Sequence, residues 1–294
     1  MHEPNDSQEI LEHDGVAVGA IRRPWNPSQG IQGSIHDDAT AQQLGFRGGT
    51  IAGSIHMDQF PPVLIRSLGE RWLETSNLSL YFLHATTHLE PVRCFARLPK
   101  QGDADPQVEV WMEHEDGTRV CDGTASVGSP SAPSALRQRL ERLRPPGELR
   151  MLAGLEPGAT LEPRPARISL DSQRERLEHI TEPLDAYLSP DAPALPPVSA
   201  VEALRRAEAG LPQMGRAEAV GLFGAIELEH VHGPVFAERD YVASGSVLAV
   251  GETPKTEYFW YESRLDEPDG GPCVAQMVMM LRFMKGSSPL WSGA

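Results

Sequence analysis

His36 and Asp38, two positions apart, are the side chains in this sequence whose types best suit proton transfer. Imidazole titrates near neutral pH, so a histidine can accept and return a proton under ordinary conditions. Asp38, or its neighbour Asp37, can orient such a ring. We therefore predict that His36 and Asp38 are catalytic. The alternative is a loop histidine beside an aspartate that caps the next helix.

A second pair of the same kind, His56 and Asp58, follows a glycine-rich stretch at residues 48–53. Glycines allow a tight backbone path into a helix, and the first N–H groups of a helix are unpaired donors that can face a developing negative charge. The alternatives are glycines that only permit a turn and a helical pair satisfied by solvent or by the core. We predict that His56 is catalytic and that the substrate is bound by Gly49, Thr50, Gly53 and Asp58.

A loop and two helices must position these residues. Prolines and glycines predict the loop at residues 24–34, and an aspartate cap with a closing glycine predicts a helix at residues 39–44. Apolar spacing predicts a second helix at residues 53–72, which Pro61 and Pro62 must kink or restart because proline removes an amide donor. From residue 78 the apolar period changes to two, which predicts strands at residues 78–85, 90–98, 107–113 and 118–127.

The second half of the chain follows a similar plan. Asp116-Gly117 before Val120-Cys121 is matched by Asp269-Gly270 before Cys273-Val274. The predicted elements of this half are a strand at residues 164–170, a helix at 198–209 and strand-like sequence at 220–283. We predict a tail at residues 1–14, a first domain at 15–128, a Pro/Ser-rich linker with a short helix at 129–158, and a second domain at 159–294.

Composition narrows the class of protein. Apolar residues make up 40% of the chain and charged residues 23%, as in a soluble globular protein, and the net charge of -15 argues against nucleic-acid binding. We find neither an apolar stretch of the roughly 18 residues that suggest a membrane span nor the charged start and apolar run of a secretory signal. We therefore expect a cytoplasmic protein that binds neither nucleic acid nor membrane.

Metal and cofactor motifs are not recognisable in the sequence. The three cysteines are odd in number and far apart, which argues against a disulfide framework and a zinc site. The histidines and acids form no close-spaced ligand set, and we find neither a Walker-type phosphate loop nor a Gly-x-Gly-x-x-Gly after a strand. We expect no metal and no cofactor.

The loop and helix start resemble those of MaoC-like hot-dog proteins. In that family a segment of the form Asp-x-Asn-Pro-(Leu/Ile)-His-x-Asp supplies a catalytic Asp and His, and a later Ile-Ala-His-Gly opens the central helix. His36 and Asp38 match the His-x-Asp part, whereas Ile31 replaces the catalytic Asp, Gly33-Ser34 replaces Asn-Pro, and the helix-start His is missing. The matching pieces are Ile35-His36-Asp37-Asp38-Ala39-Thr40-Ala41, Leu44-Gly45-Phe46-Arg47-Gly48 and Ile51-Ala52-Gly53.

The resemblance implies an α+β fold, a double hot-dog, in which two antiparallel sheets each wrap around a central helix. It also implies ligand tunnels between the central helix of one half and the sheet of the other half. Lys255 follows a turn in the second half, and we predict that it reaches such a tunnel and binds substrate. A lysine on the protein surface is the alternative.

The function implied is that of a cofactor-independent lyase, of hydratase/dehydratase type, acting on an acyl thioester or a related beta-hydroxy carbonyl compound. The acyl group would be carried on coenzyme A or acyl carrier protein. His36 with Asp38 would transfer protons, and amides near Thr50 and Gly53 would stabilise the enolate-like oxygen. The alternatives are an acyl thioesterase and a non-catalytic acyl-binding module, which Ile31 favours. Substrate identity and oligomeric state, a homodimer included, stay open.

Overall fold

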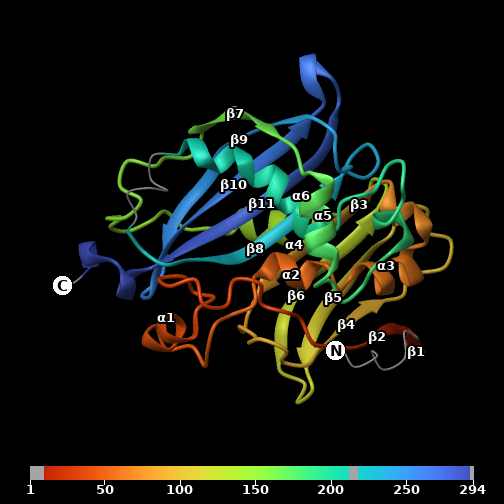
Figure 1. Ribbon diagram of the computed structural model, residues 1–294, viewed down its shortest axis with the longest axis horizontal. Helices are drawn as coiled ribbons and strands as arrows, with labels where there is room; N and C mark the ends of the chain where they lie inside the picture. Colours follow the sequence, from red (N-terminus) through yellow and green to blue (C-terminus); the bar gives the residue numbers. More distant parts are fainter. Residues whose placement is uncertain (1–9, 212–217, 292–294) are drawn as a thin grey trace.

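A single antiparallel sheet organises the part of the chain that the computed structural model describes, residues 10–211 and 218–291. Helices lie against this sheet (Figure 1). Its eleven strands are β1 (Leu11–His13), β2 (Val16–Arg22), β3 (Ser76–Phe82), β4 (Val92–Arg97), β5 (Gln107–His114), β6 (Arg119–Val127), β7 (Thr160–Ala166), β8 (Gly221–His230), β9 (Tyr241–Glu252), β10 (Thr256–Asp266) and β11 (Cys273–Met284). The α-helices are α1 (Asp38–Gln43), α2 (Gly53–Met57), α3 (Pro61–Leu68), α4 (Ala135–Leu140), α5 (Leu170–Leu177) and α6 (Pro197–Leu204). Short 3-10 helices are η1 (Glu70–Leu73), η2 (Asp185–Tyr187), η3 (Arg205–Gly210), η4 (Pro268–Gly270), η5 (Lys285–Ser287) and η6 (Pro289–Trp291).

The same strand order occurs in both halves of the chain. In the first half the order across the sheet is β2-β4-β5-β6-β3, and in the second half it is β7-β9-β10-β11-β8. Counted within its half, each unit therefore runs first, third, fourth, fifth and second strand. The two second strands, β3 and β8, pair antiparallel from Ser76 with His230 to Tyr81 with Ala225.

This pairing corrects the prediction of two separate sheets, because the two five-stranded units share one sheet. A free strand edge exposes unpaired N–H and C=O groups, and pairing β3 with β8 satisfies both edges at once. The α+β class and the antiparallel strands are confirmed. Strand β1, which pairs with β2, lies in the segment that we predicted as an N-terminal tail.

The central helices lie on one face of this sheet. Pro61 begins a new helix, so the predicted helix at residues 53–72 is divided into α2, α3 and η1. The apolar residues of α3, including Val63 and Leu64, are buried against β2 and β4. Helix α6 packs on β9, β10 and β11 and contacts α2, so the helices of the two halves meet above the sheet junction (Figure 1).

The opposite face of the sheet junction is covered by the linker. Helix α4 contacts β3, β6 and β8, and its Leu136 is fully buried with Trp260 and Met280. Strand β11 is therefore covered on both faces, because Met279 and Leu281 belong to the core beneath the central helices. This arrangement explains why the sequence of β11 is apolar at nearly every position.

Local elements of the second half differ from the sequence prediction. The strand predicted at residues 164–170 is β7, Thr160–Ala166, and it is followed by the unpredicted helix α5. Ser169 caps that helix by accepting a hydrogen bond from the amide of Ser172. The sequence at 168–170 therefore belongs to a helix start rather than to a strand.

Within the described ranges, no helix is both long and apolar enough to cross a membrane.

A buried carboxylate connects the central helices of the two halves. Asp58 is 4% exposed and accepts a hydrogen bond of 2.8 Å from the amide of Val198 in α6. Burial raises the pKa of Asp58 to about 8, and the Val198 amide and the charge of Arg176 only partly oppose this shift. The carboxyl group is thus harder to ionise in the folded protein than in water.

We predict that Asp58→Asn stabilises the protein at alkaline pH. A group whose pKa is raised by folding contributes stability that is present below its unfolded pKa and is lost as the pH rises through its folded pKa. Asparagine keeps an acceptor for Val198 and cannot ionise. The unfolding free energy of the variant should exceed that of wild type by about 1–3 kcal/mol near pH 9, and the difference should shrink toward pH 4.

Denaturant unfolding across this pH range measures the effect, with Asp191→Asn as an exposed carboxylate control. A difference that stayed constant with pH, or that grew toward acid, would show that Asp58 is readily ionised in the folded state.

Candidate functional site

A cavity of about 480 Å³ lies between the two halves, within the usual range for a small-molecule site. Three segments of the first half form one side: the loop at His36, the start of α2 and the end of β3. The second half contributes the start of β8, the turn at residues 253–256 and the end of β11. The cavity is therefore built from both halves, and it depends on the β3–β8 junction beside it.

His36 lines this cavity and is held through one ring nitrogen. Its Nδ1 lies 2.6 Å from the carbonyl oxygen of Thr50. A carbonyl oxygen only accepts, so Nδ1 carries the proton, and the neutral ring has its lone pair on Nε2. Nε2 has no hydrogen-bond partner within the described part of the chain. The ring thus has a fixed orientation and one available basic nitrogen.

The carboxylate of Asp38 binds the loop backbone and not, as predicted, the ring of His36. Its Oδ1 accepts a hydrogen bond of 2.7 Å from the amide of Gly49, and within the described part of the chain it forms no hydrogen bond or ion pair with the His36 ring. The helix cap is Asp37, which accepts from the amide of Thr40 at 3.0 Å. This hydrogen bond lowers the pKa of Asp37. Neither aspartate orients His36, because the Thr50 carbonyl does so.

Gly49 is explained by the close approach of two backbone segments. It does not line the cavity, although we predicted that it binds substrate. A methyl group at this position would lie 2.1 Å from the carbonyl oxygen of His36. Gly53, which does line the cavity, is similarly constrained because a methyl group there would lie 2.3 Å from the ring of Phe82.

His56 reaches the cavity wall as a buried, neutral group. Its Nε2 lies 2.7 Å from Oγ1 of Thr86, and its Nδ1 accepts from the side-chain amide of Gln59 at 3.3 Å. Burial lowers the pKa of His56 to about 3. Both ring nitrogens are therefore occupied, and His56 is a donor to Thr86 rather than a free base.

The backbone donors near the helix start are fewer than predicted. The amide of Thr50 donates to the carbonyl of Ile35 at 3.0 Å, and the amide of Ile51 donates to that of Thr86 at 2.9 Å. The amide of Gly53 makes no hydrogen bond within the described segments. Of the amides at residues 49–53, those of Ala52 and Gly53 therefore remain available at the cavity.

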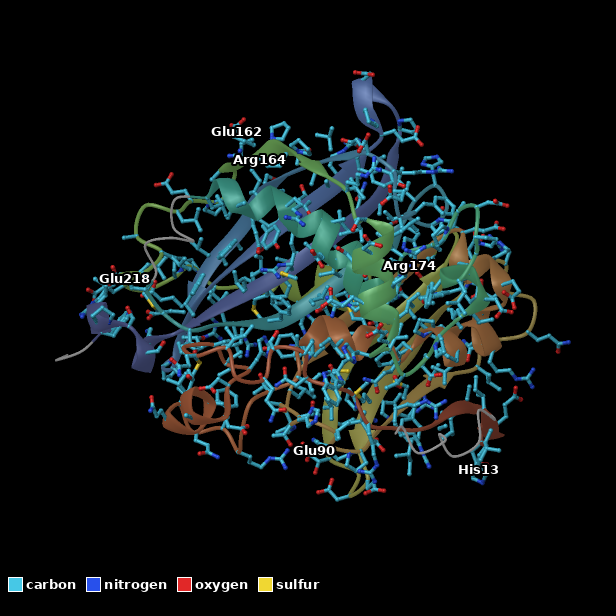
Figure 2. All side chains as sticks on the ribbon, viewed as in Figure 1. His13, Glu90, Glu162, Arg164, Arg174 and Glu218 are labelled. Carbon is cyan, nitrogen blue, oxygen red and sulfur yellow. The ribbon has the colours of Figure 1, made fainter. Side chains whose placement is uncertain are left out.

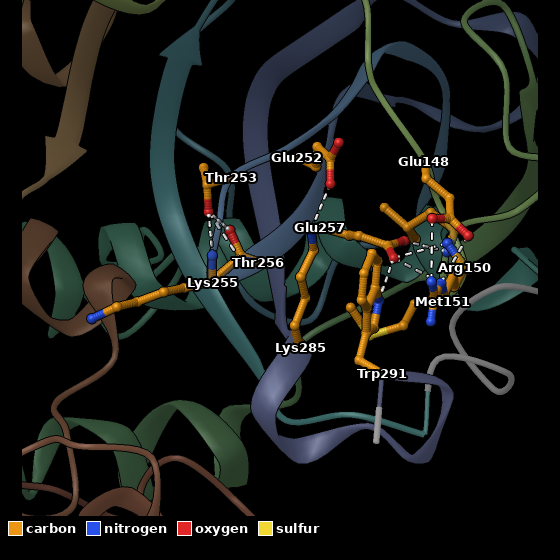
Figure 3. Close-up of polar contacts among 11 residues, drawn as sticks. Glu148, Arg150, Met151, Glu252, Thr253, Lys255, Thr256, Glu257, Lys285 and Trp291 are labelled. Atoms are coloured by element: carbon orange, nitrogen blue, oxygen red, sulfur yellow. Dashed lines mark hydrogen bonds and ion pairs between the residues drawn. The ribbon is translucent and has the colours of Figure 1, made fainter. Parts of the chain in front are cut away.

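Lys255 lines the cavity from the second half. Figure 3 shows its side chain extending away from the neighbouring ion pair of Lys285 with Glu252, whose Nζ–Oε2 distance is 2.5 Å. The backbone of Lys255 is fixed by the turn, in which its amide donates to Oγ1 of Thr253. Lys255 is exposed and makes no ion pair with another described residue.

Asp58, which we predicted to bind substrate, is outside the cavity lining.

A second, more polar cavity of about 610 Å³ adjoins the first one. The two share part of their walls, including Thr50 and His84. Glu90, which lines this second cavity and is labelled in Figure 2, is already engaged by Arg47 and by the amide of Thr87 at 2.8 Å. Burial opposes its ionisation, but these donors outweigh burial and lower the pKa of Glu90. This carboxylate is therefore a structural anchor.

Among the cavity residues that the sequence analysis missed, Phe82, Phe223 and Arg282 are the most informative. Phe82 and Phe223 supply apolar wall, which alternation along a strand does not distinguish from ordinary core. Arg282 had a usable signal, because it is the single charged residue in the largely apolar strand β11. Ile31, at the position of the family's catalytic Asp, is 57% exposed and lies outside the cavity lining.

The fold has close counterparts among solved structures. A protein from Chloroflexus aurantiacus assigned as a MaoC domain dehydratase superposes with a TM-score of 0.63 at 13% identity, covering 96% of this chain and 98% of its own. A conserved protein from Mycobacterium tuberculosis, described as a double hot-dog, superposes with a TM-score of 0.55 at 10% identity, covering 84% of this chain and 86% of its own. The chain has the double hot-dog fold.

The hot-dog fold that the loop motif implied is thereby confirmed, and at these identities the likeness shows the fold alone. No family model matches the sequence, and no curated protein matches it. What this hot-dog protein does must therefore be argued from its own cavity.

We predict that Gly49→Ala destabilises the protein by about 1–3 kcal/mol, the typical cost of overpacking a site that cannot relax. The added methyl group meets backbone atoms at 2.1 Å, so the loop at His36 must move. Thermal or denaturant unfolding measures the loss. Gly286→Ala is the matched control, because the nearest atom to its methyl group lies 4.0 Å away. Equal stability of the two variants would disprove the close packing of this loop.

Proposed function

We propose that this protein is a cofactor-independent hydro-lyase that interconverts an enoyl thioester and its 3-hydroxyacyl form. The observation that carries the proposal is His36, whose Nδ1 is fixed by the Thr50 carbonyl and whose Nε2 is left available at a cavity between two hot-dog halves. The dehydratase assignment of the structural neighbour from Chloroflexus aurantiacus supports this choice of reaction class.

One base is sufficient for the proposed reaction. In the direction of dehydration, Nε2 of His36 removes the proton from C2, and electrons move onto the thioester carbonyl oxygen. The same imidazolium then protonates the departing hydroxyl group at C3, so that water leaves and the double bond forms. Hydration is the reverse sequence, and protons balance in both directions without a carboxylate.

Charge on the carbonyl oxygen requires a donor that is available at the cavity. The amide of Gly53 has no other acceptor in the described part of the chain, and we assign it this role in the proposal. His56 would act one step away, because it donates to Thr86 and so fixes the direction of the Thr86 hydroxyl group. Asp38 would contribute by holding Gly49 and the loop.

A non-catalytic acyl-binding module is the second candidate, and a specific observation favours it. The described residues that line the cavity include neither aspartate nor glutamate, and Ile31 occupies the position of the family's catalytic acid. The same observation weighs against a thioesterase, in which a carboxylate would activate the attacking water. A binding module would keep the cavity and show no turnover.

We predict that His36→Ala lowers the rate of enoyl thioester hydration by about two to four powers of ten, the usual contribution of a general acid–base group. Activity is followed by loss of the conjugated absorbance, with free thiol measured in parallel. His232→Ala is the matched control, because its Nδ1 also lies against a backbone carbonyl, that of Cys273 at 2.9 Å, and it lies outside the cavity lining.

Full activity in a folded His36→Ala protein would refute the proposed role of the ring. Thiol release without loss of conjugation would indicate a thioesterase. A rise in melting temperature with an acyl thioester, without either signal, would indicate the binding module, because a ligand that prefers the native state stabilises it.

A further inference from the structure

The ionisable side chains that line the cavity are all basic. They are Lys255, Arg282 and three histidines, and no carboxylate accompanies them in the described part of the lining. The chain as a whole is acidic, with a net charge of -15. A basic cavity in an acidic protein is a local feature that a bound anion would compensate.

Arg282 is held in place by its neighbours. Its Nη2 donates to the hydroxyl of Tyr81 at 2.6 Å, and its Nε is buried without an acceptor. Gly224 makes this position possible, because a methyl group there would lie 2.4 Å from Nε. The guanidinium is therefore held in the cavity wall by close packing.

The positive charge of Arg282 has no counter-ion in the described structure. The side chain forms no ion pair, and the ring of Tyr81 also contacts a second guanidinium, that of Arg139. Asp122 pairs with Arg139 at 3.8 Å and leaves Arg282 unpaired. A half-buried, unpaired charge is unfavourable by itself, and an anionic ligand would remove that cost.

Lys255 adds a second unpaired cation on the exposed side of the same cavity. The contrast with Lys285 is informative, because Lys285 is engaged by Glu252 and does not line the cavity. Figure 3 shows the side chain of Lys285 pointing toward Glu252 and that of Lys255 extending away from this pair. The pair of free cations thus belongs to the cavity rather than to the surface network.

We propose that Arg282 and Lys255 form an anion subsite for a carboxylate on the acyl group, so that the substrate is a thioester of a dicarboxylic acid. This inference rests on the proposed function. A carboxylate is the planar anion that a guanidinium binds best, and the remaining wall, with Phe82 and Phe223, suits a short carbon chain. A volume of about 480 Å³ accommodates such an acyl group, with the bulky carrier left outside.

The first test compares two enoyl thioesters on one carrier, one ending in a carboxylate and one ending in a methyl group. Wild type should prefer the carboxylate by about ten- to a hundredfold in kcat/KM, the usual value of a charged hydrogen bond. Arg282→Gln should remove this preference, and Arg282→Lys should keep part of it. Arg164→Gln on the outer strand β7, labelled in Figure 2, is the control and should keep the full preference.

Tyr81→Phe separates binding from packing, since it removes the hydrogen bond to Arg282 and keeps the guanidinium. We expect this variant to retain most of the preference. An unchanged preference in Arg282→Gln, or a complete loss in Tyr81→Phe, would overturn the subsite.

The second test measures binding without turnover, by calorimetry with saturated glutaryl and pentanoyl thioesters of N-acetylcysteamine. These compounds carry no double bond to hydrate and no phosphate. Selective binding of the glutaryl compound, lost in Arg282→Gln, would support the subsite even if hydration failed. Turnover without any carboxylate preference would leave the proposed function standing and refute the subsite. An effect of Arg282 that appeared only with coenzyme A thioesters would assign the anion to the phosphates of the carrier and would also refute it.

Discussion

The antiparallel pairing of β3 with β8 is the interaction on which the rest of the structure depends. It joins two five-stranded units into one sheet and brings the ends of β8 and β11 next to the loop at His36. Ser76 and His230 contact each other at this junction at 3.2 Å, and burial lowers the pKa of His230 to about 4. The buried Glu227 of β8, which pairs with Ser79 of β3 at this junction, is compensated by the hydroxyl of Ser134 and by the ion pair with Arg137.

Backbone contacts, rather than acidic side chains, position the candidate base. The amide of Thr50 donates to the carbonyl of Ile35, and this hydrogen bond fixes the peptide whose carbonyl accepts from His36. The close approach of the two backbone segments at Gly49 maintains this geometry. Asp38 stabilises the loop from outside by binding the Gly49 amide. The site can therefore hold one oriented imidazole without the acid that Ile31 replaces.

The cavity wall is basic because the neighbouring carboxylates are already paired with other cations. Glu90, which lines the adjoining cavity, and Glu252, which precedes the turn at residues 253–256, are engaged by Arg47 and Lys285. Arg282 and Lys255 are left without such partners. A chain with an acidic overall charge thus presents a basic wall to a ligand, and the sheet junction fixes this wall beside His36.

The sequence by itself determined the loop motif and most of the elements, but it indicated neither β1 nor α5. Alternating apolar residues identified β3 to β6, and His36 could be singled out because its neighbours match a family pattern. The tertiary structure decided which groups meet. Whether Asp38 orients His36 depends on where its carboxylate points, and whether β3 joins β8 depends on two edges far apart in the chain. Arg282 illustrates the same limit. A charge within an apolar strand was visible in the sequence, but its lack of a counter-ion is a property of the folded neighbourhood, because electrostatic compensation depends on distance in space.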